Sequence, residues 1–132
     1  MPLARISVPS SLPAHKISAL ADAVHRSLVS TCNVPDKDRF QIISAFAQGM
    51  MIIDPTFPDV QRSSEASIVE ILFLEGRSVA QKRQLFRMIG ELAVAAGFRG
   101  DDITIALSEN STADWSLGHG LMFEKHHAPA SS

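Results

Sequence analysis

The 132-residue sequence lacks several features that define common classes of protein. Cys32 is its single cysteine, so no disulfide can form within the chain, as is typical of a reducing cytoplasm. No apolar run approaches the roughly 20 residues of a membrane-spanning helix, and the first residues lack the pattern of a signal peptide. The net charge is −2, without a basic cluster that would attract nucleic acid or an anionic membrane. We therefore expect one cytoplasmic domain over residues 1–132, which binds neither nucleic acid nor a membrane.

Hydrophobic residues make up 45% of the chain, and their spacing predicts two successive strand–helix–strand units. The first unit spans residues 3–45. Apolar and polar residues alternate over Leu3–Val8, which predicts a strand, and Phe40–Ile43 predicts a second one. Between them, Ser10 or Ser11 is expected to cap a helix. Its apolar stripe has helical spacing and consists of Ile17, Leu20, Ala21, Val24 and Leu28.

The second unit spans residues 67–109 and repeats this plan. Ser67–Leu74 predicts a strand, and Ser78 with Gln81 forms a capping-box pair that opens a helix. The closing strand is predicted from the alternation of Ile103, Ile105 and Leu107. The expected apolar face of the helix consists of Val79, Phe86, Ile89, Leu92, Ala93 and Ala96.

Two segments lie outside these units. Gly49–Ile53 is predicted to form a short further strand, and residues 124–132 are predicted to form a tail. Three histidines near the end of the chain are His119, His126 and His127. Because no acidic residue or cysteine is spaced to complete a site with them, we expect no metal.

The predicted architecture is α/β (α+β), a four-stranded sheet with two helices on one face. Each crossover is expected to be right-handed, with the two strands of its unit parallel. The strand over residues 67–74 is apolar on both faces, so both faces need to be covered. Two helices cannot cover both, which predicts an oligomer that packs its sheet faces together with closed symmetry.

Pro2 is a candidate for acid–base chemistry. Initiator methionine is usually removed before a small residue, and loss of Met1 would turn the Pro2 nitrogen into a free secondary amine. An α-amino group titrates near 7.7–8.0, roughly, and burial or neighbouring charges shift that value. The strand that follows would hold this amine in a fixed place.

Four short motifs occur in order along the chain. They are Val24-His25-Arg26, residues 34–41 (Val-Pro-Asp-Lys-Asp-Arg-Phe-Gln), Gly76-Arg77-Ser78, and residues 113–120 (Ala-Asp-Trp-Ser-Leu-Gly-His-Gly). With the proline at position 2 and the doubled strand–helix–strand plan, they resemble the tautomerase superfamily, and within it the malonate semialdehyde decarboxylase group. The resemblance covers residues 2–123.

The resemblance implies a homotrimer whose sheets form a barrel, and catalysis around a terminal proline without a cofactor. It implies that Pro2 is the catalytic amine and that Asp38 positions or activates water. Arg77 would hold the carboxylate of a small substrate. Trp115 and Phe123 would form part of an apolar wall.

One position departs from the pattern of the decarboxylases. They carry a second arginine two residues before the one that Arg77 matches, and here that residue is Glu75. The sequence therefore favours a tautomerase that uses Pro2 on a 2-oxo or enol carboxylate. A decarboxylase or hydratase of a 3-oxo acid such as malonate semialdehyde, and a non-catalytic trimeric binding module, remain open. Asp38 would raise the amine pKa and Arg77 would lower it, so the charge on Pro2 at neutral pH also stays open.

Simpler roles compete with these functional ones. Arg77 would pair with Glu75 at the surface, and Asp38 would pair with Arg39. His25 lies one position beyond the apolar stripe of the first helix. It is therefore expected at the helix surface or in an interface.

Overall fold

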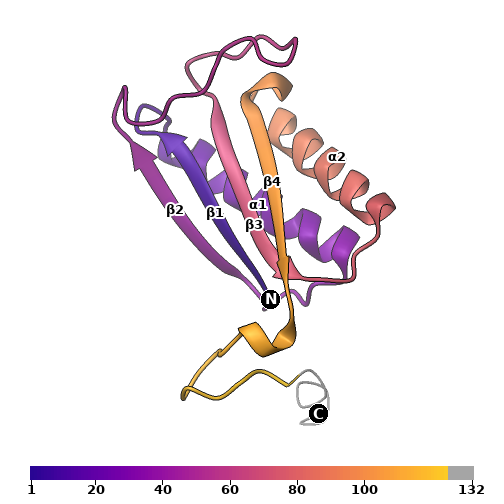
Figure 1. The fold of residues 1–132 in the computed structure, drawn as a ribbon. Helices are drawn as coiled ribbons and strands as arrows, with labels where there is room; N and C mark the ends of the chain where they lie inside the picture. Colours follow the sequence, from indigo (N-terminus) through magenta and orange to yellow (C-terminus); the bar gives the residue numbers. More distant parts are fainter. Residues whose placement is uncertain (125–132) are drawn as a thin grey trace.

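The computed structural model describes residues 1–124, and shows a four-stranded sheet packed against two long helices (Figure 1). The elements in chain order are β1 (Pro2–Pro9), α1 (Ala14–Cys32), β2 (Phe40–Phe46), β3 (Ser67–Leu74), α2 (Val79–Ala95) and β4 (Ile103–Asn110). Single turns of 3₁₀ helix lie at Gly100–Asp102 and Thr112–Asp114. The predicted tail lies outside the described residues from position 125 onward, as do His126 and His127.

The sheet has the strand order β2-β1-β3-β4. β1 pairs with β2 in parallel, β3 pairs with β4 in parallel, and β1 and β3 run antiparallel to each other. The two strand–helix–strand units therefore meet at the centre of the sheet, and both helices cover the same face. The predicted fold class is confirmed.

The core lies between this sheet face and the helices. Alternate residues of β1 and β3 face the helices. Each helix faces the sheet with a stripe of apolar residues spaced three or four apart. Full burial of each large aliphatic side chain contributes about 1.5–3 kcal/mol. The largest of the fully buried apolar side chains are Ile6, Val8, Leu20, Val24, Leu28, Val69, Ile71, Phe73, Leu85 and Ile89.

The helix termini correct two predictions. The N-cap of α1 is Pro13, without a side-chain hydrogen bond, and neither Ser10 nor Ser11 caps it. In α2 the predicted capping box of Ser78 and Gln81 is confirmed. Its predicted apolar face is wrong at Val79 and Phe86, which are exposed.

The buried stripe of α2 instead runs through Leu85, Ile89 and Ala93, at successive intervals of four residues. Phe86 lies about 100° further around the helix than Leu85, so only one of these neighbours can face the sheet. Hydrophobicity does not distinguish them, and packing against the sheet selects Leu85.

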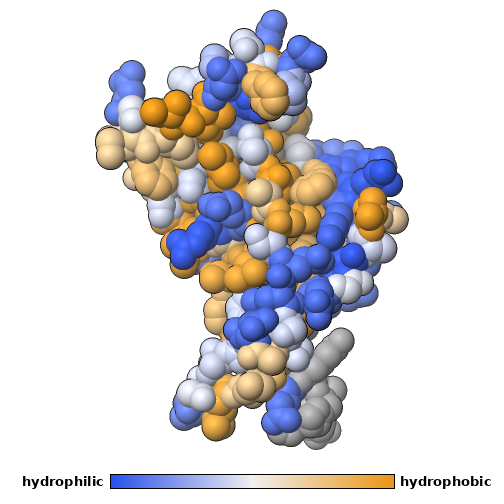
Figure 2. Space-filling model, viewed as in Figure 1, coloured by the Kyte–Doolittle hydropathy of each residue, from blue (hydrophilic) through white to orange (hydrophobic). Residues whose placement is uncertain are grey.

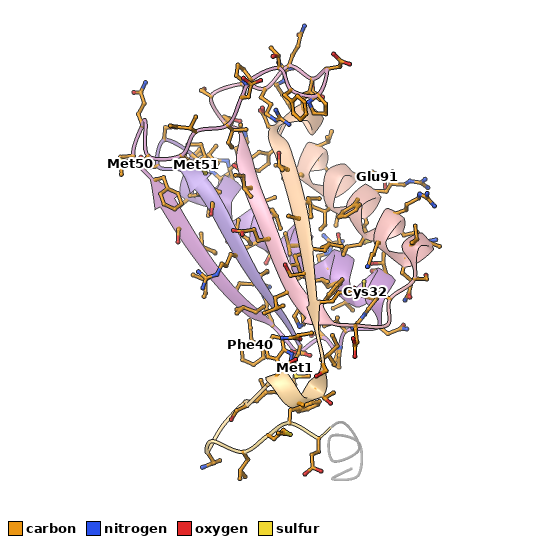
Figure 3. All side chains as sticks on the ribbon, viewed as in Figure 1. Met1, Cys32, Phe40, Met50, Met51 and Glu91 are labelled. Atoms are coloured by element: carbon orange, nitrogen blue, oxygen red, sulfur yellow. The ribbon has the colours of Figure 1, made fainter. Side chains whose placement is uncertain are left out.

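Gly49–Ile53 forms no strand, contrary to prediction. Gly49 has a φ of +87°, which strands do not use, and the side chain of Ile52 is 91% exposed. Met50 and Met51 lie at the end of the sheet opposite to Met1 (Figure 3). The apolar run from Met50 to Ile53 has no strand edge beside it in the described chain, so its strand propensity is not realised.

The loop between β2 and β3 is ordered by its own polar contacts. The Asp54 carboxylate accepts backbone N–H groups from Thr56 at 3.0 Å and from Phe57 at 2.9 Å. These hydrogen bonds lower the pKa of Asp54, and the one from Thr56 has the largest effect. Arg62 Nη1 donates to the backbone oxygens of Asp54 at 2.6 Å and Phe57 at 2.5 Å. The loop therefore keeps its shape without pairing to the sheet.

No element of residues 1–124 covers the second face of the sheet, which we call the open face (Figure 2). Arg5 and Glu70 stand directly opposite each other there, on β1 and β3. Around this pair lie apolar side chains, which alternation and register assign to the same face: Leu3, Phe40, Ile42, Ile68, Leu72 and Leu74. Neither helix of the described chain is both long and apolar enough to cross a membrane.

Candidate active site

The predicted site residues gather at one end of the sheet. Because β1 and β3 are antiparallel, the start of β1 lies beside the end of β3, and Pro2 stands opposite Phe73. The end of β4 and the segment after it lie at the same end, below the N-terminus in Figure 1. Met1 and Phe40 are also found here (Figure 3).

The N-terminal amine is paired with a carboxylate. Met1 is 8% exposed, and its ammonium group donates a hydrogen bond to Asp38 Oδ2. The other oxygen, Asp38 Oδ1, is buried and accepts no hydrogen bond from residues 1–124. Pro2 itself is fully buried. Asp38 does not pair with Arg39, which binds Asp22 at 2.8 Å instead, so this carboxylate faces the start of the chain.

Arg77 is anchored by two backbone oxygens. Its Nη1 donates to Leu74 O at 3.0 Å, and its Nη2 donates to Cys32 O at 2.9 Å. Cys32 ends α1, where the helix dipole favours a cation. The guanidinium carbon lies 5.2 Å from the ring centroid of Phe73, a cation–π distance. Glu75 is exposed and does not bind Arg77, so the simple surface pair is not formed.

These anchors leave part of the guanidinium available. Arginine carries five N–H donors, and Arg77 uses two of them. The remaining three have no acceptor within residues 1–124. Because Phe73 both underlies this guanidinium and pairs with Pro2, Arg77 and the start of β1 lie on the same side of the sheet. A carboxylate bound by the free donors would therefore lie near the N-terminus.

Trp115 and Phe123 belong to a short hairpin after β4. Trp115 Nε1 donates to Asn110 Oδ1 at 2.6 Å, and Phe123 N donates to Trp115 O at 2.8 Å. Both aromatic side chains are half-buried at the Pro2 end of the sheet. No hydrogen bond joins them to Pro2 or Arg77. Their role as a substrate wall therefore stays a prediction.

His25 lies in an environment that the sequence did not predict. It is 6% exposed, so the expectation of a helix-surface position is wrong. Its Nε2 lies 2.7 Å from the backbone oxygen of Asp36, in the connection from α1 to β2. That connection folds over the end of α1 and buries the imidazole. The motif Val24-His25-Arg26 was the only signal in the sequence for a special role.

The site therefore combines an N-terminal amine, a carboxylate and a preorganised guanidinium, an arrangement suited to moving protons on a small carboxylate. A family model described as "Tautomerase enzyme" matches residues 38–118, so the chain belongs to this tautomerase family. The resemblance inferred from the sequence motifs is confirmed.

Individual relatives agree with this assignment. Probable tautomerase YusQ from Bacillus subtilis (strain 168) is 30% identical over 121 residues, covering 91% of this chain and 95% of that protein. The structure of FG41 malonate semialdehyde decarboxylase inhibited by 3-bromopropiolate is 35% identical, with a TM-score of 0.86 over 90% of this chain and 91% of that one. A further malonate semialdehyde decarboxylase, described with decarboxylase and hydratase activities, is 31% identical with a TM-score of 0.84, covering 90% and 92% of the two chains.

Proposed function

We propose that the protein is a cofactor-independent tautomerase, an isomerase that uses the Pro2 amine on a small 2-oxo or enol carboxylate. The pairing of the N-terminal amine with Asp38, at the end of the sheet where Arg77 lies over Phe73, carries this proposal. Removal of Met1 would transfer the free amine to Pro2 and vacate the buried space that Met1 fills. The substrate would enter that space.

The Pro2 nitrogen stays within reach of the Asp38 carboxylate. One residue spans at most about 3.6 Å, so the nitrogen lies within about 6 Å of the Asp38 oxygen that binds the Met1 ammonium. At that distance, and at an effective dielectric near 20, a unit charge is worth about 2.8 kcal/mol, or about two pK units. Asp38 would raise the pKa of the Pro2 amine and Arg77 would lower it. A pKa near neutrality would let this one group serve as both acid and base.

The reaction follows from these positions. Arg77 binds the substrate carboxylate with the N–H donors that Leu74 and Cys32 leave free. The neutral Pro2 amine accepts the proton from the 2-hydroxyl of an enol, while the C–O bond becomes a carbonyl. The resulting ammonium returns that proton to carbon 3. The enol becomes a 2-oxo acid, and the amine is restored.

A second function, a lyase acting on a 3-oxo acid such as malonate semialdehyde, has one observation in its favour. Asp38 Oδ1 is a buried carboxylate oxygen without a partner, and such an oxygen can accept a proton from water. A cationic Pro2 would polarise the substrate carbonyl, so that carbon dioxide leaves or water adds. Glu75 opposes this function because its negative charge stands two residues before Arg77. We therefore favour the tautomerase.

Charge reversal at Glu75 tests whether this residue faces the substrate carboxylate. The wild-type protein is expected to ketonise phenylenolpyruvate more efficiently than it decarboxylates malonate semialdehyde. Glu75→Arg is expected to lower KM for both carboxylates, about fivefold, because repulsion becomes attraction. Steady-state kinetics with both substrates measure this.

Glu91→Arg is the matched control, since Glu91 is an exposed glutamate of α2, away from the Met1 end (Figure 3). It makes the same change in net charge and should leave KM unaltered. Equal KM values for wild type and Glu75→Arg would show that Glu75 does not face the substrate. Absence of both reactions in protein that has lost Met1 would favour the binding module.

We also propose that the protein is a homotrimer that buries its open faces. Static light scattering should give three times the 14.3 kDa of one chain. Ile42→Glu places a charge on the open face and should reduce this mass. Phe86→Glu, on the outside of α2, should not, although the exposures of Ile42 and Phe86 are similar, at 41% and 39%. A monodisperse wild-type monomer at micromolar concentration contradicts the assembly.

A further inference from the structure

His25 is a buried polar side chain outside the set that handles the substrate. It lies on α1 among core residues and is 6% exposed. Its Nε2 is 2.7 Å from the backbone oxygen of Asp36. A carbonyl oxygen only accepts hydrogen bonds, so the proton of this bond belongs to Nε2. The Asp36 carboxylate is further away, at 3.8 Å, so the backbone of Asp36 is the partner.

The acceptor lies in the tight turn that carries Asp38. Asp38 N donates to Pro35 O at 3.0 Å, and Arg39 N donates to Lys37 O at 2.9 Å. Before the turn, buried Val34 anchors the chain, with its N–H 3.4 Å from Leu28 O. Within the turn, the side chains of Asp36 and Lys37 are exposed. His25 therefore provides the only side-chain hydrogen bond from α1 to the backbone of this turn in residues 1–124.

We infer that His25 is a positioning residue, which holds the turn so that Asp38 faces the N-terminal amine. The inference rests on the proposed function of that amine. The peptide unit after Asp36 is planar, so a hydrogen bond to its oxygen also orients the Lys37 end of that unit, directly before Asp38. Without the bond, the backbone of Asp36 and Lys37 has no side-chain hydrogen bond from α1, although Arg39 still pairs with Asp22 beyond it. The Asp38 carboxylate is then free to move relative to the amine.

The effect of such a movement on the amine depends on the charged residues of the elements at this end of the sheet. They include Asp36, Lys37 and Asp38 of the turn, Glu75 and Arg77 after β3, and Glu109 of β4, which pairs with Lys82 at 3.3 Å. Arg77 keeps its own anchors on Leu74 and Cys32, and Glu75 follows β3, so neither depends on His25. Asp36 and Lys37 carry opposite exposed charges, so displacement of the turn acts mainly through Asp38. A carboxylate that recedes from about 6 to about 8 Å lowers the amine pKa by about half a unit at an effective dielectric near 20.

Two amide variants test whether the hydrogen bond from residue 25 to the Asp36 oxygen positions Asp38. His25→Gln places an amide N–H about where Nε2 stands, whereas the shorter His25→Asn does not reach the Asp36 oxygen. In the Asn variant we expect the pKa of the Pro2 amine to fall by about half a unit and kcat to fall about tenfold, since misplaced groups lose catalytic effect. In the Gln variant both should stay near wild type. The pKa is measured by ¹⁵N NMR of the processed protein labelled at proline, and kcat by phenylenolpyruvate ketonisation.

Two controls separate the possible outcomes. Val24→Ala removes core volume from the same helix, so it should lower Tm without moving the amine pKa. Asp38→Asn removes the carboxylate and should lower that pKa by about two units. Equal amine pKa values in the Asn and Gln variants overturn the inference about His25 and leave the proposed function standing. An unchanged pKa in Asp38→Asn contradicts the proposed function itself.

Discussion

Pro2→Ala is expected to lower kcat for enol ketonisation by a factor of about 10² to 10⁴, the usual contribution of a general acid–base group. Alanine keeps an N-terminal amine after loss of Met1, but that amine is primary and lacks the rigid ring. The ring of Pro2 is fully buried, opposite Phe73, and without it the nitrogen is free to move relative to Asp38 and Arg77. Steady-state kinetics of the purified variant measure the loss.

Pro9→Ala is the matched control, because Pro9 is the last residue of the same strand. It removes a proline ring at the opposite end of β1 and should keep wild-type kcat. Circular dichroism and light scattering check that both variants retain fold and assembly. Wild-type kcat in correctly processed Pro2→Ala protein would show that the proline amine is not the catalyst.

Arg77→Ala is expected to reduce kcat/KM by about 10- to 150-fold, since hydrogen bonds to a charged partner contribute about 1.5–3 kcal/mol. If the guanidinium binds ground state and transition state equally, the loss falls on KM. If it stabilises charge that develops during the reaction, the loss falls on kcat. Kinetics with phenylenolpyruvate distinguish the two.

Arg77→Ala also removes the bonds to Leu74 and Cys32, so its free energy of unfolding should fall by about 1–3 kcal/mol. Arg77→Lys keeps the charge but cannot bind two backbone oxygens and a carboxylate in one plane, so it should recover only part of kcat/KM. Arg87→Ala, at an exposed position on α2, is the control for loss of an arginine. An Arg77→Ala protein that is less stable but has wild-type kcat/KM would assign Arg77 a structural role alone.

The sequence predicted the sheet better than the helix surfaces and the loops. Alternation over Leu3–Val8 and Ser67–Leu74 has one physical explanation, a strand with two different faces, and both strands were found. The α2 stripe needed a choice between adjacent apolar residues, Leu85 and Phe86, which only the packed sheet makes. The apolar run over Gly49–Ile53 has strand propensity, but a strand also needs a partner, and it pairs with none within residues 1–124.

The candidate site residues were proposed for a different reason. Asp38 and Arg77 lie in motifs and Pro2 follows the initiator methionine, and such signals carry information that periodicity lacks. Their partners are distant in sequence, and no local rule foresees them: the Met1 ammonium for Asp38, and the oxygen of Cys32 for Arg77. The burial of His25 likewise depends on how the connection after α1 folds back over that helix.

The central claim is that Pro2 presents a nucleophilic secondary amine in the site. A 3-halo-2-oxo acid, drawn in by Arg77, should alkylate this amine. Mass spectrometry of the intact protein and of its N-terminal peptide locates the label, and Cys32, a buried thiol, is the competing nucleophile. We expect one label per chain, on Pro2, with activity lost in proportion to labelling. A label on Cys32 alone, or full activity in protein labelled at Pro2, would contradict it.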